Sequence, residues 1–165
     1  MAPPLLSRTH GFTLFEVLIA VLVLSLGLLG LAALQSTGMR SNHSAYHRSQ
    51  ATVLAYDIID RMRGNKTVAE TGGYDLALAD PPPSLPADPN CVTNCSSADL
   101  ADYDRNNWIQ GLSAALPLGD GAVARTPVGC GPGPGLVPCI VTVTVAWDDN
   151  RSGGANQQFV MSTQL

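Results

Sequence analysis

The stretch that decides the fold is Gly11-Phe12-Thr13-Leu14-Phe15-Glu16, followed without a break by the apolar run 17–34. The length of this run is about what a membrane-spanning helix needs, because such helices take roughly 20 apolar residues. Glu16 stands at the head of the run, and the next charged residue is Arg40. A carboxylate inside hydrocarbon costs about 2.5–3.5 kcal/mol on insertion scales. We therefore expect Glu16 either to lie at the level of the lipid headgroups or to meet a positive partner.

Residues 11–16 resemble the processing site of the type IV pilin family, in which a dedicated peptidase cuts after the glycine and the new amino terminus is methylated. The resemblance implies cleavage between Gly11 and Phe12, with N-methyl-Phe12 as the first mature residue and Glu16 as the fifth. It also implies that Glu16 pairs with the terminal amine of a neighbouring subunit in a filament. In a helix, Glu16 and Phe12 are four residues apart and share a face.

A secretory signal peptide is the competing interpretation of this N-terminal segment. Such a signal is cut after its apolar region at a small-x-small site, and Ala32-Ala33 imitates one. The apolar run is longer than a signal needs, and a signal has no use for Glu16 at its head. Charge does not decide the orientation, because Arg8 and the amino terminus before the run nearly balance Arg40 and Arg48 after it.

The 165 residues are enough for one long helix and one small head. We expect a prepilin leader over residues 1–11, a helix over 12–64 that spans the membrane over about 14–34, and a periplasmic head over 65–165. The formal net charge is −4, which argues against a nucleic-acid-binding protein, since such domains usually carry a basic patch.

Four cysteines lie beyond the apolar run, in the close pairs Cys91 with Cys95 and Cys130 with Cys139. Four cysteines allow three connectivities, and we favour two local disulfides. Zinc is the alternative, but the interval from Cys130 to Cys139 is too wide and too rich in glycine and proline for a zinc knuckle. Disulfides would place the head in an oxidising space such as the periplasm. We expect no metal and no other cofactor.

The first helix is predicted to continue beyond the apolar run, because one apolar stripe recurs at helical spacing up to Gly64-Asn65. Its members are Ala51, Leu54, Ala55, Ile58 and Met62. Asp57 and Arg61, four residues apart, are expected to form an exposed ion pair. The glycines and prolines of residues 67–90 predict a surface loop without regular structure.

The head is predicted to hold a second helix and a small antiparallel sheet. Ser96 and Asp99 form a capping signal, and Leu100, Trp108, Leu112 and Leu116 are expected to face the core before Pro117 ends the helix. Asp99, Asp102, Asp104 and Arg105 are expected in solvent. Strands are predicted at 122–126, 140–147 and 157–163. The fold class is therefore α+β, a long N-terminal helix packed on a small antiparallel sheet, as in type IV pilins.

No catalytic motif stands out, so we do not expect an enzyme. His43 and His47 lack an evident third ligand and are interpreted as solvated residues. The acidic group Asp148-Asp149-Asn150 is interpreted as a hairpin turn, with a calcium site as the alternative.

The C-terminal part is similar to minor pilins of the PilV family. The resemblance is carried by Asp99-Leu100, Trp108, Leu112, Leu116-Pro117, residues 119–121 and residues 141–148. It implies a minor pilin of the type IV pilus, with a single pass through the inner membrane. The implied partners are membrane lipid, the prepilin peptidase and methyltransferase, the inner-membrane assembly platform, the major pilin and other minor pilins. The alternatives are a minor pseudopilin of a type II secretion system and a tip adhesin or DNA-uptake pilin.

Overall fold

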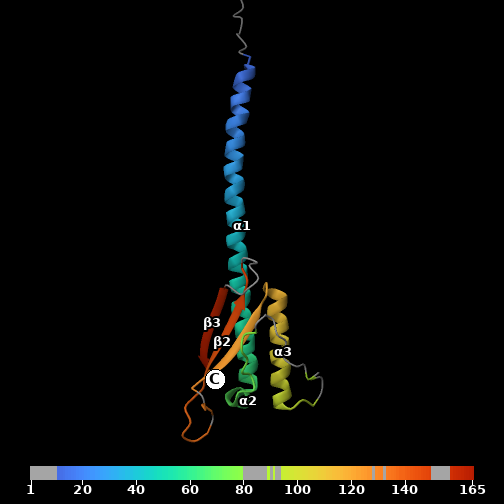
Figure 1. Cartoon of the computed structure of the whole chain (residues 1–165), viewed down its shortest axis with the longest axis vertical. Helices are drawn as coiled ribbons and strands as arrows, with labels where there is room; N and C mark the ends of the chain where they lie inside the picture. Colours follow the sequence, from blue (N-terminus) through green and yellow to red (C-terminus); the bar gives the residue numbers. More distant parts are fainter. Residues whose placement is uncertain are drawn as a thin grey trace, which may run out of the picture. The chain divides into compact units, whose positions relative to one another are not determined.

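The computed structural model describes residues 11–79, 89, 91, 94–127, 129–131, 133–149 and 157–165. Six elements follow one another along the chain (Figure 1): α1 (Leu14–Gly64), α2 (Lys66–Thr71), α3 (Ser97–Ala115), β1 (Asp120–Thr126), β2 (Ile140–Trp147) and β3 (Gln157–Gln164). The chain divides into two compact units, residues 1–43 and 44–165, and we describe each by itself. The predicted fold class is confirmed: a long N-terminal helix accompanies a small three-stranded antiparallel sheet.

In the first unit, the described residues from Leu14 onward are the N-terminal part of α1. This helix is long and apolar enough to cross a membrane, by length and composition alone. Every residue of α1 up to His43 is exposed. The helix forms here because leucine and alanine favour it and no proline interrupts it.

In the second unit, the strands lie in the order β1-β2-β3 and both pairings are antiparallel. The predicted alternation of β2 is confirmed, because Val141, Val143 and Val145 are fully buried whereas Thr142 and Thr144 lie on the opposite, partly exposed face. Opposite faces take alternate residues because successive strand side chains point to opposite sides of the sheet. On β3, Phe159 and Met161 pack against the same core, as expected.

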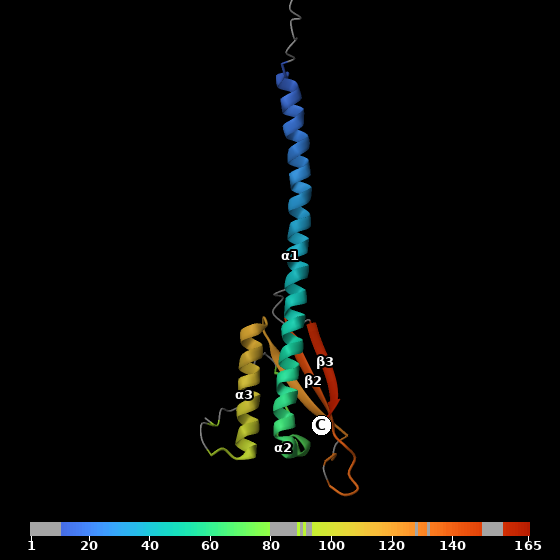
Figure 2. The ribbon, with the colours of Figure 1, turned by 180° about the vertical axis from the view of Figure 1, so that it is seen from behind.

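The buried face of the sheet packs against residues 44–64 of α1 and against α3. In the reverse view, α1 passes in front of the sheet and α3 lies beside α1 (Figure 2). From α1, the buried residues are Ala51, Ala55, Ile58, Ile59 and Met62. Trp108 of α3 is fully buried, and its indole N–H donates a 2.8 Å hydrogen bond to the carbonyl oxygen of Leu54. Burial of each large apolar side chain contributes about 1.5–3 kcal/mol. Hydrophobic burial therefore holds the second half of α1 to the head.

The predicted start of α3 is confirmed. The backbone N–H of Asp99 donates to the Ser96 hydroxyl at 3.1 Å, and the Ser96 N–H donates to the Asp99 carboxylate at 3.2 Å. This reciprocal pair satisfies N–H groups that the first turn of a helix leaves free. Leu100, however, is 40% exposed, so the prediction that it faces the core is wrong. Leu100 precedes Trp108 by eight residues, which places the two side chains about 80° apart around the helix.

The prediction of an irregular loop from residue 67 onward is also wrong at its start, because α2 occupies Lys66–Thr71. This short helix ends at Gly72, whose φ of 100° is left-handed, and the N–H groups of Gly72 and Gly73 bond the last helical carbonyls. The stretch contains no proline, so nothing prevents a helical turn there. After the turn, Leu76 forms an isolated bridge with Val123 of β1. The prolines predicted to form the loop at 81–83 and 86 lie outside the described residues.

A buried polar cluster joins α1, α3 and the turn after α2. The carboxylate of Asp104, in a residue only 6% exposed, accepts a 3.0 Å bond from the Arg61 guanidinium and a 2.6 Å bond from the Tyr74 hydroxyl. Arg61 also donates to Asp57 at 2.9 Å, and Asn65 donates to the Tyr74 hydroxyl at 3.4 Å. The prediction that Asp104 stays in solvent is therefore wrong. The predicted ion pair of Asp57 and Arg61 does form, but both side chains are partly buried and Arg61 binds Asp104 as well. Asp104 is buried because it meets charged and polar partners that compensate for lost water.

The cluster perturbs two of its members. Burial opposes the positive charge of Arg61, but its bonds to Asp104 and Asp57 outweigh burial and raise the pKa of the guanidinium. Burial and the hydrogen bond to Asp104 raise the pKa of the Tyr74 hydroxyl well above its ordinary value. Both groups therefore hold their protons more firmly than in water.

Candidate functional site

The N-terminal segment begins with exposed, non-helical backbone from Gly11 to Thr13, and α1 starts at Leu14. Thr13 ends this segment as the helix cap: its hydroxyl accepts a 3.2 Å hydrogen bond from the N–H of Glu16, whose N–H also lies 3.1 Å from the Thr13 carbonyl oxygen. The chain therefore changes from open backbone to helix immediately after the Gly11-Phe12 bond.

Glu16 lies in the first turn of α1. The free N–H groups at the start of a helix give that end a partial positive charge, which favours a carboxylate there by about 0.3–1 kcal/mol. Thr13 and Glu16 also have the spacing of a capping box, so this stretch of sequence carries a helix-start signal that was not predicted from it. The helix start thus offers Glu16 some stabilisation without an ion pair.

The residues that follow present apolar side chains in every direction. Phe12 is 83% exposed and Leu14 is 84% exposed, although residues of these types are normally buried. The exposed set continues through Phe15, Val17, Leu18, Ile19, Val21, Leu22, Val23, Leu24, Leu26, Leu28, Leu29, Leu31 and Leu34. A surface of this extent needs lipid or other protein to cover it.

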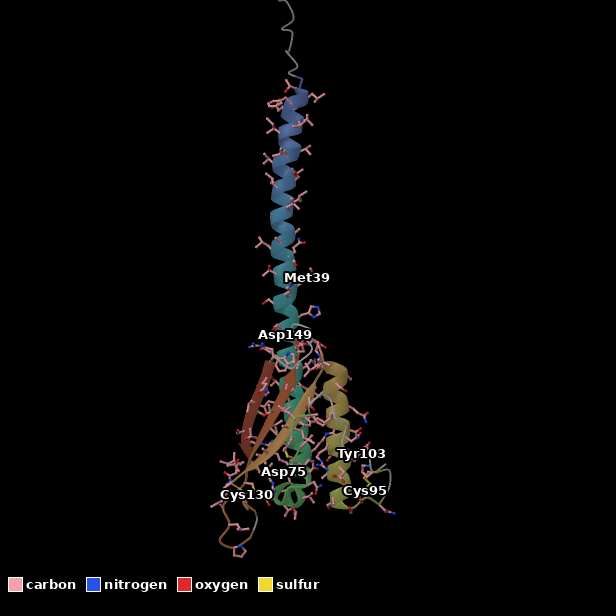
Figure 3. The ribbon with its side chains drawn as sticks, viewed as in Figure 1. Met39, Asp75, Cys95, Tyr103, Cys130 and Asp149 are labelled. Atoms are coloured by element: carbon pink, nitrogen blue, oxygen red, sulfur yellow. A yellow bond between two sulfur atoms is a disulfide. The ribbon has the colours of Figure 1, made fainter. Side chains whose placement is uncertain are left out.

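The cysteines form two disulfides within the head. Cys130 and Cys139 are joined across the loop between β1 and β2, with Cα atoms 5.0 Å apart, and both residues are buried. Figure 3 shows Cys130 beside the end of the sheet, where this loop begins. Cys91 and Cys95 are joined just before Ser96, the cap of α3, with Cα atoms 5.6 Å apart. The disulfide of Cys130 and Cys139 therefore closes the loop at its base.

An ion pair lies at the same end of the sheet. The Arg125 guanidinium donates to the Asp75 carboxylate at 2.9 Å and to the carbonyl oxygen of Glu70 at 2.6 Å. Asp75 is labelled in Figure 3. These contacts attach the end of β1 to α2 and to the turn that follows it.

No group of three His, Cys, Asp or Glu side chains gathers closely enough to hold a metal within the residues that the structure describes. His47 is half-buried, which differs from the solvated position expected for it. Asp148 is buried, and its N–H donates a 2.8 Å bond to the carbonyl oxygen of Pro117. Asp149 is also described, but Asn150 lies outside the described residues.

Comparison with protein families found two adjacent matches. A model described as the prokaryotic N-terminal methylation motif matches residues 6–32, and a model described as type IV pilin Tt1218 matches residues 33–106. Comparisons with curated proteins and with solved structures found no match. The first match contains the Gly11-Phe12 bond and Glu16, and the second runs from the apolar helix into α3. With the exposed apolar helix and the small sheet, these matches support a type IV pilin that carries the prepilin methylation motif.

Proposed function

We propose that this pilin is a minor pilin that helps to initiate the type IV pilus and enters its tip complex. In this proposal a peptidase cuts between Gly11 and Phe12, the new amino terminus on Phe12 is methylated, and the subunit assembles with the major pilin and other minor pilins. The observation that carries the proposal is the capped helix start, with Glu16 in its first turn and an exposed apolar helix behind it. We assign the protein a structural role and no catalytic activity.

Exposure of the processing segment supports the cleavage step. Gly11, Phe12 and Thr13 are all exposed, and among the residues that the structure describes none comes within 4 Å of a Cβ placed on Gly11. A peptidase needs access to an extended backbone on both sides of the bond that it cuts. We accordingly propose residues 1–11 as the leader that is removed.

The membrane arrangement follows from the same helix. We propose that about residues 14–34 span the inner membrane once and that residues 65–165 form a periplasmic head. The disulfide of Cys130 and Cys139 supports this side of the membrane, because disulfides persist in oxidising compartments. An inner-membrane assembly platform would then transfer the helix from lipid into the filament.

We propose that the negative charge of Glu16 acts in assembly. In an apolar filament interior, an unpaired carboxylate is costly, and the methylated amine of a neighbouring subunit is the nearest cation that a processed pilin offers. Pairing of the two would set the register between adjacent subunits. The unbroken course of α1 through Ala33, where many pilins have a proline, favours a minor subunit.

The experiment compares Glu16→Gln with Glu16→Asp in cells that lack the native gene. Glutamine serves at the third position of a capping box as glutamate does, so Glu16→Gln keeps the helix start but removes the charge. We expect both variants to be cleaved after Gly11, and we expect Glu16→Gln to lose surface pili while Glu16→Asp retains part of them. N-terminal sequencing and mass spectrometry would show methylated Phe12, and any other mature end contradicts the processing step.

A pseudopilin of a type II secretion system would share this N-terminal chemistry. Deletion of the gene separates the two roles: loss of surface pili with normal secretion of exported enzymes supports the minor pilin, and the reverse pattern contradicts it. An adhesin or DNA-uptake pilin would instead leave pilus number unchanged and reduce attachment or uptake.

A further inference from the structure

We propose that the open edge of β3 is a docking site for an edge strand from the head of a different pilin. The inference rests on the proposed function and names the surface through which a partner subunit binds. β3 forms the outer edge of the sheet in both Figure 1 and Figure 2. Among the described residues, no strand pairs with that edge.

The register identifies the backbone groups that face outward from this edge. In an antiparallel pair, the residues that exchange hydrogen bonds alternate with residues whose N–H and C=O groups point away from the partner strand. The Leu165 N–H donates to the Cys139 carbonyl oxygen, and this places residues 157, 159, 161 and 163 in bonding contact with β2. Gln158, Val160 and Ser162 therefore direct their N–H and C=O groups outward.

A second contact gives the same assignment from the other edge of the sheet. Val123 of β1 exchanges hydrogen bonds of 2.8 and 2.9 Å with Leu76, so residue 123 points away from β2. The pairing of Val123 with Val143 and of Val143 with Met161 then places Met161 in the row that bonds β2. Two independent contacts thus agree that the even-numbered residues of β3 face the open edge.

The chemistry of this edge suits another strand. β3 reads Gln-Gln-Phe-Val-Met-Ser-Thr-Gln and contains no charged residue and no proline, the two devices that commonly protect an edge strand from pairing. The outward face of β2 and β3 is also uncharged; its exposed and partly exposed residues are Ile140, Thr142, Thr144, Gln158, Val160, Ser162 and Gln164. Val160 is 55% exposed and Ile140 is 48% exposed. We infer a partner strand of neutral, partly apolar residues.

The geometry disfavours a second copy of this chain as the partner. At the β1 edge, the outward N–H and C=O groups of Val123 already bond Leu76, so among the described residues β3 is the longer open edge that a second copy has to offer. The Arg48 side chain donates to Gln157, so the start of residues 44–64 lies at the start of β3. Cys139 pairs with Leu165 at the end of β3 and also contacts Glu70, which follows α1. Residues 44–64 of α1 therefore run in the same direction as β3.

Antiparallel pairing of two β3 strands would consequently turn the two α1 segments in opposite directions, which does not suit subunits anchored in one membrane. Parallel pairing of two β3 strands would relate them by a two-fold axis along the strands. Identical outward N–H and C=O groups would then lie at the same height, whereas a parallel ladder requires the bonding groups to be staggered. A strand from a different chain avoids both conflicts, and heads of other pilins are the neighbours that the proposed function provides.

The experiment uses the full chain in cells that express the complete pilus assembly system. A photo-crosslinking amino acid, p-benzoylphenylalanine, replaces Val160 at the open edge or, as the matched control, Ala124. Ala124 is exposed on the same face of the sheet as Val160. It belongs to β1, however, at the opposite edge, where Val123 pairs with Leu76. We expect the Val160 site to link to the head of another pilin and the Ala124 site to give much less product.

A second pair of variants tests the backbone itself. Ser162→Pro removes an outward N–H that does not bond β2, and Ser162→Ala keeps that N–H while losing the same hydroxyl contact with Thr142. We expect Ser162→Pro to reduce the cross-linked product about tenfold, which corresponds to one lost hydrogen bond and its unsatisfied partner, and Ser162→Ala to leave it unchanged. Native emission from the buried Trp108 and Trp147 of the purified variants shows that each variant has kept its fold.

The outcomes separate the inference from the proposed function. Three results would overturn the docking site and leave the proposed function standing. They are linkage to a second copy, equal products from Ser162→Pro and Ser162→Ala, and no linkage from a chain that is processed and present in pili. A chain that is neither cleaved nor found in pili overturns the proposed function, and the docking site with it.

Discussion

Replacement of Asp104 by alanine tests whether the buried polar cluster stabilises the head. Asp104 accepts hydrogen bonds from Arg61 at 3.0 Å and from Tyr74 at 2.6 Å, and a hydrogen bond to a charged group contributes about 1.5–3 kcal/mol. The Arg61 side chain is 33% exposed and keeps its bond to Asp57, so water and Asp57 would compensate part of the loss. We therefore expect Asp104→Ala to lower the free energy of unfolding by about 2–4 kcal/mol.

Tryptophan fluorescence provides the assay. The chain has two tryptophans, Trp108 and Trp147, and both are buried in the head. Urea unfolding of the full chain in detergent micelles, followed by their emission, therefore reports on the head and not on the apolar part of α1. The free energy of unfolding comes from linear extrapolation to zero urea.

Asp102→Ala is the matched control, because Asp102 lies on the same helix and also pairs with an arginine. Its side chain is 43% exposed, so loss of its ion pair with Arg105 should change stability by no more than about 0.5–1 kcal/mol. If Asp104→Ala costs no more than Asp102→Ala, the argument that burial makes the cluster important is wrong.

Three further predictions use the same assay. Because the pKa of Tyr74 is raised, the folded head keeps the phenol proton above about pH 10, where an unfolded tyrosine releases it. The free energy of unfolding should therefore fall as the pH rises above about 10, and Tyr74→Phe should weaken this fall. Gly121→Ala should destabilise the head by about 1–3 kcal/mol, since its Cβ would overlap the Trp108 ring, whereas Gly111→Ala meets its nearest neighbour at 3.6 Å and should be neutral or stabilising. Replacement of both Cys130 and Cys139 by serine should lower stability by about 2–3 kcal/mol, and an unchanged urea midpoint would show that the loop closure does not constrain the unfolded chain.

The features that the sequence predicted well are those with local causes. The Ser96 and Asp99 cap is encoded within four residues, and the alternation of β2 follows from the two-residue period of a strand. The start of α1 is marked just as locally by Thr13 and Glu16, although the hydrogen bond between them became evident only in the structure.

The features that the sequence did not predict depend on contacts between distant segments. Asp104 reads as a surface carboxylate because its partners, Arg61 and Tyr74, stand 43 and 30 residues away. The α2 helix was hidden because the glycines and prolines that follow it dominate the composition of residues 67–90. The open edge of β3 emerged only from strand order and register, since a strand sequence does not indicate which neighbours it has.

The attachment of residues 44–64 of α1 to the sheet has a mechanical consequence. This helix segment runs in the same direction as β3, so a pull along its axis loads the helix–sheet interface in shear. The apolar contacts around Ala51 and Ile58 would then bear the force together with two bonds that join α1 to α3, from Trp108 to Leu54 and from Arg61 to Asp104. Contacts loaded together resist more force than contacts broken one after another, so the head is built to stay on its helix under tension.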